Sequence, residues 1–290
     1  MKGILLAGGA GTRLHPTTRG VSKHLLPLYD KPMVYYPLTT LLWTGATEIL
    51  IITTPEEQSS YRRLLGDGSW LGVKFQWAVQ AEPKGISQAL LIGKDFLSGE
   101  PCTLALGDNV FYGHGLPEAL ERSAKCAKNG ATVFVYQVSD PQRYGVMEFD
   151  GKGKPKGIVE KPKYPPSAWA VTGLYMYDGS APERATKLNP SARGELEITD
   201  LNLSYLSSGN LRVEKLGRGI AWLDTGTPTA MLQASMFIQT IEERQGLKVC
   251  CPEEVAFRLG LIGEKDILRQ ADTLGKSAYG LYLRSLLEKD

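Results

Sequence analysis

The chain has 290 residues, of which 42% are hydrophobic and 22% charged, and its formal net charge at pH 7 is +2. This length permits one large α/β domain or two smaller ones with a substantial core. The small net charge argues against a polyanionic partner such as nucleic acid, so any phosphate binding must be local.

The cysteines and the hydropathy of the sequence narrow the class of protein further. Cys102, Cys126, Cys250 and Cys251 show neither paired C-x-x-C spacing nor nearby histidines, so we expect reduced thiols rather than a zinc site or a disulfide framework. The first strand-like run begins at Gly3, which leaves no room for a secretory signal. No apolar run approaches the roughly 20 residues of a membrane span. We therefore expect a soluble, cytoplasmic protein without membrane contact.

Strand-like and helix-like segments alternate in the first 110 residues. Short apolar runs rich in β-branched residues occur at residues 3–7, 49–53, 75–79 and 103–106. Segments of helical length and spacing lie between them, at residues 33–44, 56–65 and 86–97. This alternation predicts an α/β fold with a Rossmann-like, mostly parallel sheet and helices on both faces.

The pattern changes past residue 130. Strand-like runs follow with few helices between them, at residues 132–138, 145–149, 156–160 and 169–177. We expect this half to extend the sheet and to build one wall of a cleft. Two helices at residues 197–206 and 228–243 flank a strand at 211–216, and the last 40 residues are amphipathic. The sequence thus predicts a catalytic domain over residues 1–245 and a C-terminal helical appendage over residues 246–290, packed on it and serving assembly or regulation.

A glycine-rich run, L-A-G-G-A-G-T-R-L at residues 6–14, follows the first strand directly. Glycine allows positive φ and lets backbone N–H groups approach a phosphate. The run is not a P-loop, which needs G-x-x-x-x-G-K-[ST], and Leu14 stands where the dinucleotide fingerprint needs glycine. Such a turn can also serve only to reverse the chain, but Arg13 and Lys23 add the cations that a triphosphate and a departing pyrophosphate require. We therefore expect a phosphate-binding loop.

Two signatures near the amino terminus resemble those of the sugar nucleotidyltransferases, or sugar-nucleotide pyrophosphorylases. The run G-G-A-G-T-R-L at residues 8–14 and S-K-H-L-L-P at residues 22–27 resemble their G-G-x-G-T-R-L and K-Q-L-L-P segments. Further runs are similar to the thymidylyltransferase branch of that family: Y-D-K-P-M at 29–33, L-G-D-G-S at 65–69, L-G-D-N at 106–109, A-V-T-G-L-Y at 170–175, A-R-G-E-L-E-I-T-D at 192–200 and A-W-L-D-T-G-T at 221–227. The resemblance implies condensation of dTTP with glucose 1-phosphate to dTDP-glucose and pyrophosphate, by in-line attack of the sugar phosphate on the α-phosphorus.

Two aspartates are candidates for a metal site. Asp108 directly follows the apolar run 103–106, which places it at the carboxyl end of a strand, where open α/β sheets bind ligands. Asp224 also ends an apolar run in a tight turn. A lone aspartate in a turn is more often a cap, but oxygen ligands suit Mg²⁺. The resemblance implies that Asp108 and Asp224 together hold Mg²⁺.

The resemblance also implies the other site residues. The catalytic group would comprise Arg13 and Lys23 on the triphosphate and leaving group, Lys161 on the sugar phosphate, and the two aspartates. The nucleotide would be bound by Gly8, Gly11, Thr12, Arg13, Lys23, His24, Gln80, Gly85 and Asp108. The sugar phosphate would be bound by Asn109, Gly145, Glu160, Lys161 and Val171.

The sequence departs from the family pattern at three places. His24 stands where glutamine is usual, A-E-P-K-G at residues 81–85 replaces P-S-P-D-G, and Val159 replaces the first glutamate of E-E-K-P. The first two border the nucleotide pocket. UTP is therefore the natural competitor of dTTP, because it differs only by a methyl group in the base and a ribose hydroxyl. One methyl group is worth only about 1 to 3 kcal/mol in a hydrophobic pocket.

Two other classes of function compete with the enzyme. A non-catalytic sugar-nucleotide sensor would be expected to lose the carboxylates or the loop cations, yet Asp108, Asp224, Arg13 and Lys23 are all present. A nicotinamide-dependent oxidoreductase is disfavoured by Leu14. The resemblance further implies a homotetramer with a regulatory nucleotide-sugar site, fed back upon by a pathway end product such as dTDP-rhamnose in polysaccharide biosynthesis.

Overall fold

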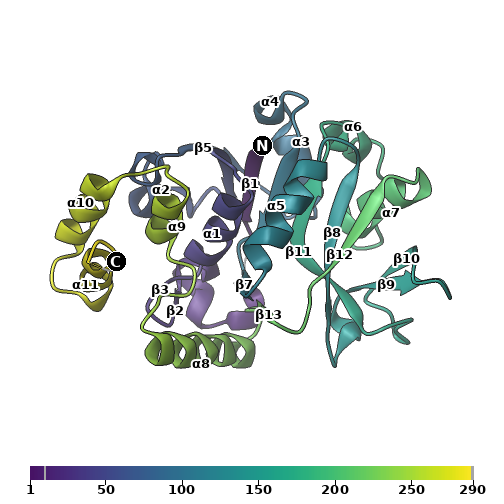
Figure 1. The fold of residues 1–290 in the computed structure, drawn as a ribbon. Coiled ribbons are helices and arrows are strands. Elements are labelled where there is room, and N and C mark those ends of the chain that lie inside the picture. The colour runs from purple at the N-terminus through teal and green to yellow at the C-terminus, as the bar shows by residue number, and fades with distance from the viewer. Residues whose placement is uncertain (10, 289–290) are drawn as a thin grey trace.

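The computed structural model describes residues 1–9 and 11–288, and a mixed nine-stranded sheet forms its centre (Figure 1). Seven strands follow one another in the order β10 (Pro155–Glu160), β9 (Gly145–Phe149), β11 (Trp169–Tyr177), β6 (Cys102–Leu106), β1 (Lys2–Ala7), β4 (Glu48–Thr53) and β5 (Lys74–Val79). Two more, β8 (Ala131–Gln137) and β12 (Leu211–Lys215), continue from β11 through β8. The α/β fold class is confirmed.

The parallel half of the sheet consists of β6, β1, β4 and β5. These strands are the four apolar runs expected near the amino terminus, each displaced by at most one residue at its start. β11 pairs antiparallel with β6 and β8, so the second half extends the sheet with a mixed strand direction, as the strand-rich texture past residue 130 predicted. All four parallel strands end at the same edge of the sheet.

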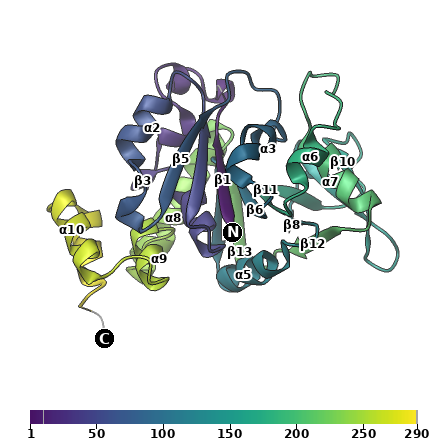
Figure 2. The same ribbon diagram turned by 90° about the horizontal axis from the view of Figure 1, so that it is seen from above.

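Alternate residues of the central strands form two separate cores. Leu5 and Ile51 belong to one core, and Ile4 and Ile52 to the other, because successive side chains of a strand point to opposite faces. The first face is covered by α1 (Tyr35–Trp43), α2 (Gln58–Leu65) and α5 (Leu116–Cys126). The second is covered by α3 (Gln88–Ile92), α4 (Lys94–Leu97), α6 (Ala181–Ala185) and α7 (Ile198–Ser207). Helices on both faces were expected, and this is confirmed (Figures 1 and 2).

The expected helix over residues 86–97 is instead two short helices that meet at Gly93. A Cβ at this glycine would lie 3.1 Å from Ile4 Cδ1 and 3.1 Å from the Ala89 carbonyl oxygen. Gly93 thus lets the helical segment approach β1 closely. The amphipathic period did not reveal this break, because a single glycine is compatible with a helical pattern.

Two small sheets lie beside the main one. They pair β13 (Ile220–Asp224) with β7 (Asn109–Gly113), and β2 (Pro27–Leu28) with β3 (Lys31–Pro32). The long helix α8 (Pro228–Gln245) packs with them in a third core that includes Leu28, Val110 and Ile238. The described residues also form short 3₁₀ turns elsewhere in the chain: η1 (Thr12–Leu14), η2 (Thr17–Arg19), η3 (Lys23–Leu25), η4 (Ser69–Leu71) and η5 (Pro141–Arg143).

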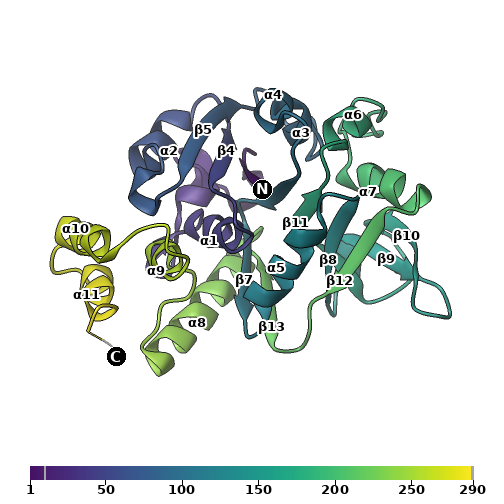
Figure 3. The same ribbon diagram turned by 45° about the horizontal axis from the view of Figure 1, so that its top comes forward.

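The chain ends in three helices, α9 (Pro252–Arg258), α10 (Glu264–Leu274) and α11 (Ala278–Ser285). Val255 and Ala256 of α9 and Leu283 of α11 join the same core as α1. Figures 1 and 3 show α10 and α11 at the end of the molecule opposite to β9 and β10. Within residues 1–9 and 11–288, no helix combines the length and the apolar character needed to traverse a bilayer.

Candidate active site at the carboxyl edge of the sheet

The glycine-rich segment begins where β1 ends. Gly9 and Gly11 take φ values of +114° and +56°, which L side chains adopt only with strain. A Cβ at Gly11 would lie 3.4 Å from Lys23 Cβ, so the loop runs beside η3. Ala10 lies outside the described residues. The loop thus has the conformation expected of a backbone that approaches a ligand closely.

Lys23 and Asp108 form an ion pair across this edge of the sheet. The Asp108 carboxylate also accepts a hydrogen bond from Asn109 Nδ2 at 2.9 Å. Burial alone would raise the pKa of Asp108, but the positive charge of Lys23 and the hydrogen bonds from Lys23 and Asn109 together lower the pKa to about 2. Asp108 is therefore ionised at neutral pH, as a cation ligand must be.

Asp224 lies next to Asp108, although 116 positions of sequence separate them. The antiparallel pairing of β7 and β13 sets Asp224 opposite Asn109. In addition, the Thr225 backbone N–H donates to the Asp108 carbonyl oxygen at 3.2 Å, and Thr225 Oγ1 donates to the same oxygen at 2.9 Å. The two aspartates that the sequence singled out thus lie at one place.

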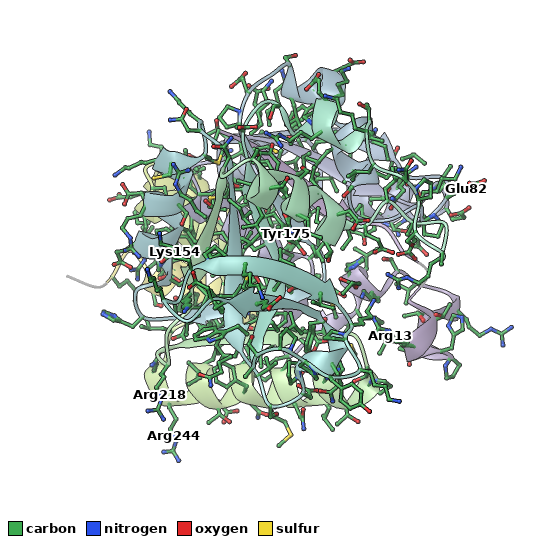
Figure 4. The ribbon with its side chains drawn as sticks, turned by 90° about the vertical axis from the view of Figure 1, so that its right-hand side faces the viewer. Arg13, Glu82, Lys154, Tyr175, Arg218 and Arg244 are labelled. Carbon is green, nitrogen blue, oxygen red and sulfur yellow. The ribbon has the colours of Figure 1, made fainter. Side chains whose placement is uncertain are left out.

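Arg13 reaches the same place from the loop. A Cβ at Gly226 would lie 3.2 Å from an Arg13 guanidinium nitrogen, so the guanidinium passes over this glycine, two residues after Asp224. Figure 4 shows Arg13 on the side of the molecule that carries Glu82, away from Arg218 and Arg244. Arg13, the Lys23–Asp108 ion pair and Asp224 therefore lie at the same edge of the sheet, where β1, β5 and β6 end.

Two side chains that the sequence analysis missed hold Asp224. Arg143 donates to Asp224 Oδ2 and the Tyr144 hydroxyl donates to Asp224 Oδ1, each at 3.1 Å. Burial raises the pKa of Tyr144, and the neighbouring charge of Asp224 raises it further. Their position immediately before Gly145, a predicted sugar contact, was the available signal.

The predicted sugar-phosphate residues gather beside Asp224. Gly145 and Glu160 are register partners in β9 and β10, and a Cβ at Gly145 would lie 3.3 Å from Glu160 Oε2. Lys161, at a φ of +43°, donates its backbone N–H to the Tyr144 carbonyl at 3.0 Å. Its Nζ lies 3.2 Å from Glu160 Oε1. Thr199, which was not predicted, donates to Glu160 Oε2 at 2.7 Å.

Asn109 and Val171 are more enclosed than the other predicted sugar contacts. Asn109 is 5% exposed, and its Oδ1 accepts hydrogen bonds from Gly173 N at 2.9 Å and Trp222 Nε1 at 2.6 Å. Val171 is 9% exposed and belongs to the core of the second face. In this structure Asn109 fixes β7 to β11 and β13 and orients the Asp108 carboxylate.

The predicted base-reading residues lie on the other side of the glycine loop. Gln80 Nε2 donates to the Gly85 carbonyl at 3.2 Å and to Gln88 Oε1 at 2.7 Å. Its Oε1 faces Gly8, where a Cβ would lie only 2.9 Å away. Gln88 was not predicted. A cavity of about 370 Å³ adjoins these residues, and its lining includes Gly9, Ser22, Gln80, Ala81 and Pro83.

His24 is buried beneath the loop, with 2% of its surface exposed. Its Nδ1 lies 3.0 Å from the Tyr61 hydroxyl. Burial, and then the charge of Lys23, lower the pKa of His24 to about 3. The imidazole is therefore neutral at physiological pH.

Within the described residues, no group of three or more histidine, cysteine, aspartate or glutamate side chains is arranged to hold a metal ion. The pairing of β7 with β13 brings two carboxylate residues, Asp108 and Asp224, to this edge of the sheet. This number is ordinary for Mg²⁺, which fills its remaining positions with water and substrate phosphate oxygens.

Comparison with known proteins identifies the family. The model of the nucleotidyl transferase family matches residues 2–241. A glucose-1-phosphate thymidylyltransferase from Xanthomonas campestris is 58% identical over 288 residues, covering 99% of this chain and 97% of that protein. One from Neisseria gonorrhoeae is 53% identical and covers both chains completely.

Solved structures agree with these relatives. A putative glucose-1-phosphate thymidylyltransferase from Bacillus anthracis, in complex with a sucrose, is 41% identical, with a TM-score of 0.75 over 82% of this chain and 94% of that one. A UDP-glucose pyrophosphorylase in complex with UDP-glucose shares the fold at 24% identity, with a TM-score of 0.70 over 83% of this chain and 98% of that one. The chain therefore belongs to the nucleotidyl transferase family, in which its full-length relatives are glucose-1-phosphate thymidylyltransferases.

Proposed function

We propose that the protein transfers a thymidylyl group from dTTP to glucose 1-phosphate, forming dTDP-glucose and releasing pyrophosphate. The convergence of Asp108 and Asp224 beside Lys23 carries this proposal. Nucleotidyl transfer is catalysed mainly by positioning and by stabilisation of phosphate charge, and this edge of the sheet supplies groups for both. The choice of substrates is supported by relatives of nearly the same length that are named glucose-1-phosphate thymidylyltransferase.

The attacking group is the phosphate oxygen of glucose 1-phosphate, which is already an anion. No general base is needed to activate it. Lys161 orients this phosphate toward the α-phosphorus of dTTP, while Arg13 and Lys23 hold the triphosphate and stabilise the pyrophosphate as it leaves. The bond from the α-phosphorus to the leaving oxygen breaks as the bond to the sugar phosphate forms, so the reaction needs no covalent enzyme intermediate.

The site fits Mg²⁺ as its cofactor. Asp108 and Asp224 offer carboxylate oxygens from two adjacent strand ends, and the low pKa of Asp108 keeps it ionised. A bound Mg²⁺ would supply positive charge and Lewis acidity at the phosphate oxygens. Arg143 and Tyr144 hold the Asp224 carboxylate in place.

The nucleobase pocket has a defined acceptor. Gln80 Nε2 is bound to Gln88 and to the Gly85 carbonyl, and Gln80 Oε1 faces Gly8. We assign this oxygen as the acceptor for the N3–H group of thymine. Gly8, Gly11 and Thr12 line the path of the triphosphate.

The sugar lies on the far side of the two aspartates. Gly145, Glu160 and Val171 border its pocket, with Asn109 beside Asp108. Thr199 and Lys161 orient the Glu160 carboxylate, which is suited to accept hydrogen bonds from sugar hydroxyls.

We assign residues 1–245 to the catalytic domain and residues 246–290 to an appendage for assembly and regulation. The family match to residues 2–241 and the end of α8 at Gln245 support this boundary. We also assign the protein to the cytoplasm. Its four cysteines are free thiols, as suits a reducing environment.

The assembly we assign is a homotetramer with a regulatory site for a nucleotide sugar. Two side chains on α8, Leu232 and Met236, are 62% and 58% exposed, as suits a face covered by another subunit. A cavity of about 190 Å³ between α1, β7 and the appendage supports a second ligand site, and its lining includes Thr39, Tyr112, Leu116, Cys250 and Arg258. Sedimentation equilibrium, with and without dTDP-rhamnose, tests this assembly.

A substrate panel tests the proposed function directly. The purified protein and Mg²⁺ are combined with each of five nucleoside triphosphates and several hexose 1-phosphates, and pyrophosphate release is measured. We expect the largest kcat/KM with dTTP and glucose 1-phosphate, and no release when Mg²⁺, nucleotide or sugar phosphate is omitted. A larger kcat/KM with UTP would reassign the nucleotide, and no release in any combination would reject the enzyme function.

A further inference from the structure

The imidazole of His24 connects three parts of the fold beneath the active site. His24 Nδ1 lies 3.0 Å from the Tyr61 hydroxyl and 3.4 Å from Ser22 Oγ, and these two hydroxyls lie 2.8 Å apart. The Tyr61 hydroxyl also lies within donating distance of the Ala7 carbonyl, at 3.3 Å. One edge of the ring is thereby tied to α2, through Tyr61, and to the end of β1, through Ala7.

The opposite edge of the ring lies against Gly107, the residue before Asp108. A Cβ at Gly107 would lie 2.8 Å from His24 Cδ2 and 3.0 Å from His24 Nε2, closer than side chains tolerate. The Gly107 backbone N–H donates to the Leu6 carbonyl at 2.9 Å. Gly107 is therefore held between β1 and the imidazole, and the ring fills the space under the turn that leads to Asp108.

We propose that His24 is a positioning residue that sets the Lys23–Asp108 ion pair, acting on Asp108 through Gly107 rather than by touching the nucleotide. The proposal rests on the proposed function, because the ion pair is where we place the triphosphate. His24 follows Lys23 in the chain and supports Asp108 from below, so one side chain fixes both members of the pair. A displacement of about 1 Å at such a site can reduce turnover about 100-fold.

The first test compares three variants by steady-state kinetics with dTTP and glucose 1-phosphate. His24→Ala removes the ring under Gly107, and we expect kcat to fall about 30-fold while both KM values change less than about threefold. His24→Gln provides an amide of similar reach and is expected to restore kcat to within about threefold of the parent value. Tyr61→Phe removes the hydroxyl that holds the ring and is expected to lower kcat about threefold to tenfold.

The double variant tests whether the two residues act through one contact. If Tyr61 acts by holding the His24 ring, Tyr61→Phe adds no further loss of kcat to His24→Ala. Independent losses that multiply would overturn the link. Tyr177→Phe is the matched control: it removes an equally buried hydroxyl, bonded to Asn202 at 2.7 Å, at the opposite end of the sheet, and kcat should stay at the parent value.

Metal affinity provides a readout that a purely structural role would leave unchanged. The dissociation constant of Mn²⁺ is measured by electron paramagnetic resonance in the presence of dTTP and without sugar phosphate. We expect His24→Ala to weaken Mn²⁺ binding about tenfold and His24→Gln to restore it. A lower melting temperature with parental kcat and Mn²⁺ affinity would overturn the proposal.

The remaining outcomes are distinguishable. A rise in KM for dTTP alone would show that His24 contacts the nucleotide and would overturn the positioning role. Should His24→Ala fail to fold, Tyr61→Phe decides the question through kcat and Mn²⁺ affinity, and parental values for both would overturn the proposal. A parent protein that forms no dTDP-glucose would reject the proposed function, and the Mn²⁺ measurement would still decide the role of His24.

Discussion

Two clusters of basic side chains and carboxylates in this molecule differ in how completely their members pair. In the first, Lys31 contacts Asp30 Oδ1 at 2.5 Å and Glu242 Oε1 at 3.0 Å. Lys248 contacts the second oxygen of each of the same carboxylates, Asp30 Oδ2 and Glu242 Oε2. Every oxygen of the two carboxylates has a lysine partner, so this cluster forms a closed ring at the end of α8.

The second cluster, at the candidate active site, is open. Among the described residues, Asp108 and Asp224 each have a cationic partner at one carboxylate oxygen only, Lys23 for Asp108 and Arg143 for Asp224. The Arg13 guanidinium lies over Gly226, beside these two aspartates. Charges in the closed ring satisfy one another and hold two segments together, whereas charges in the open cluster can bind phosphates and a cation.

The largest effect should come from the open cluster, in Asp224→Asn. The substitution removes one negative charge and changes little volume, so we expect kcat to fall about a thousandfold. The melting temperature should stay within about 2 °C of the parent value, because the side chain is part-exposed and outside the apolar core. Pyrophosphate release and calorimetry measure the two quantities.

A matched control for this variant is Asp272→Asn in α10. Asp272 is an exposed aspartate that also pairs with an arginine, Arg284, but lies in the appendage. The kcat of the Asp272→Asn variant should equal that of the parent protein. Near-parental turnover in Asp224→Asn would place the metal site elsewhere.

The closed cluster should respond in the opposite way to Lys31→Ala. This change leaves the buried Glu242 and the part-exposed Asp30 with one lysine between them. Removal of one partner of a buried ion pair, such as Lys31 with Glu242, costs about 3 to 5 kcal/mol. We expect that loss in denaturant unfolding, with kcat of the folded protein within about twofold of parent. Lys125→Ala, which breaks an exposed pair with Glu121, is the control and should cost less than about 1 kcal/mol. Equal losses in both variants would remove the distinction between closed and exposed pairs.

A smaller effect is expected at the edge of the open cluster, in Gln80→Ala. Loss of the amide removes the acceptor that we propose for the base, and we expect KM for dTTP to rise about tenfold. KM for glucose 1-phosphate should change little, because Gln80 lies on the nucleotide side of the loop. An equal rise in both KM values would contradict a base-reading role.

The smallest effect concerns pH. Because the pKa of Asp108 is lowered from 3.8 to about 2 in the folded protein, its ionisation stabilises the fold above the unfolded pKa. This stabilisation is lost as the pH falls from about 4 through about 2. We therefore expect the difference in unfolding free energy between the parent and Asp108→Asn to be constant from pH 7 to pH 5 and to shift against the parent below pH 4. A difference that already changes between pH 7 and pH 5 would contradict the lowered pKa.

Local patterns predicted the parallel half of the fold well. Strands β1, β4 and β6 are continuous runs of buried side chains such as Ile4, Ile51 and Leu104, which stand out in the sequence. The two short strands β7 and β13 were not expected. Their pairing joins residues 109–113 to residues 220–224, and no local pattern specifies a pairing over such a distance.

The candidate site was predicted as a set of residues, and the structure supplies the contacts among them. Asp108 and Asp224 could be chosen from their positions after apolar runs and from the resemblance. The sequence could not reveal that Arg143 and Tyr144 hold Asp224, or that Tyr61 holds His24. These contacts join separate elements of the fold. The residues next to a charged or hydroxyl side chain in the sequence do not indicate which distant residue it will contact.

Helix α8 connects the open cluster to the closed ring. It begins four residues after Asp224, spans 18 residues, and carries Glu242 in its final turn. Eighteen residues of α-helix form a rod about 27 Å long. Because an α-helix is a stiff element, α8 fixes the distance between Glu242, in the closed ring at one end, and the turn after Asp224 at the other, so both clusters belong to one rigid frame.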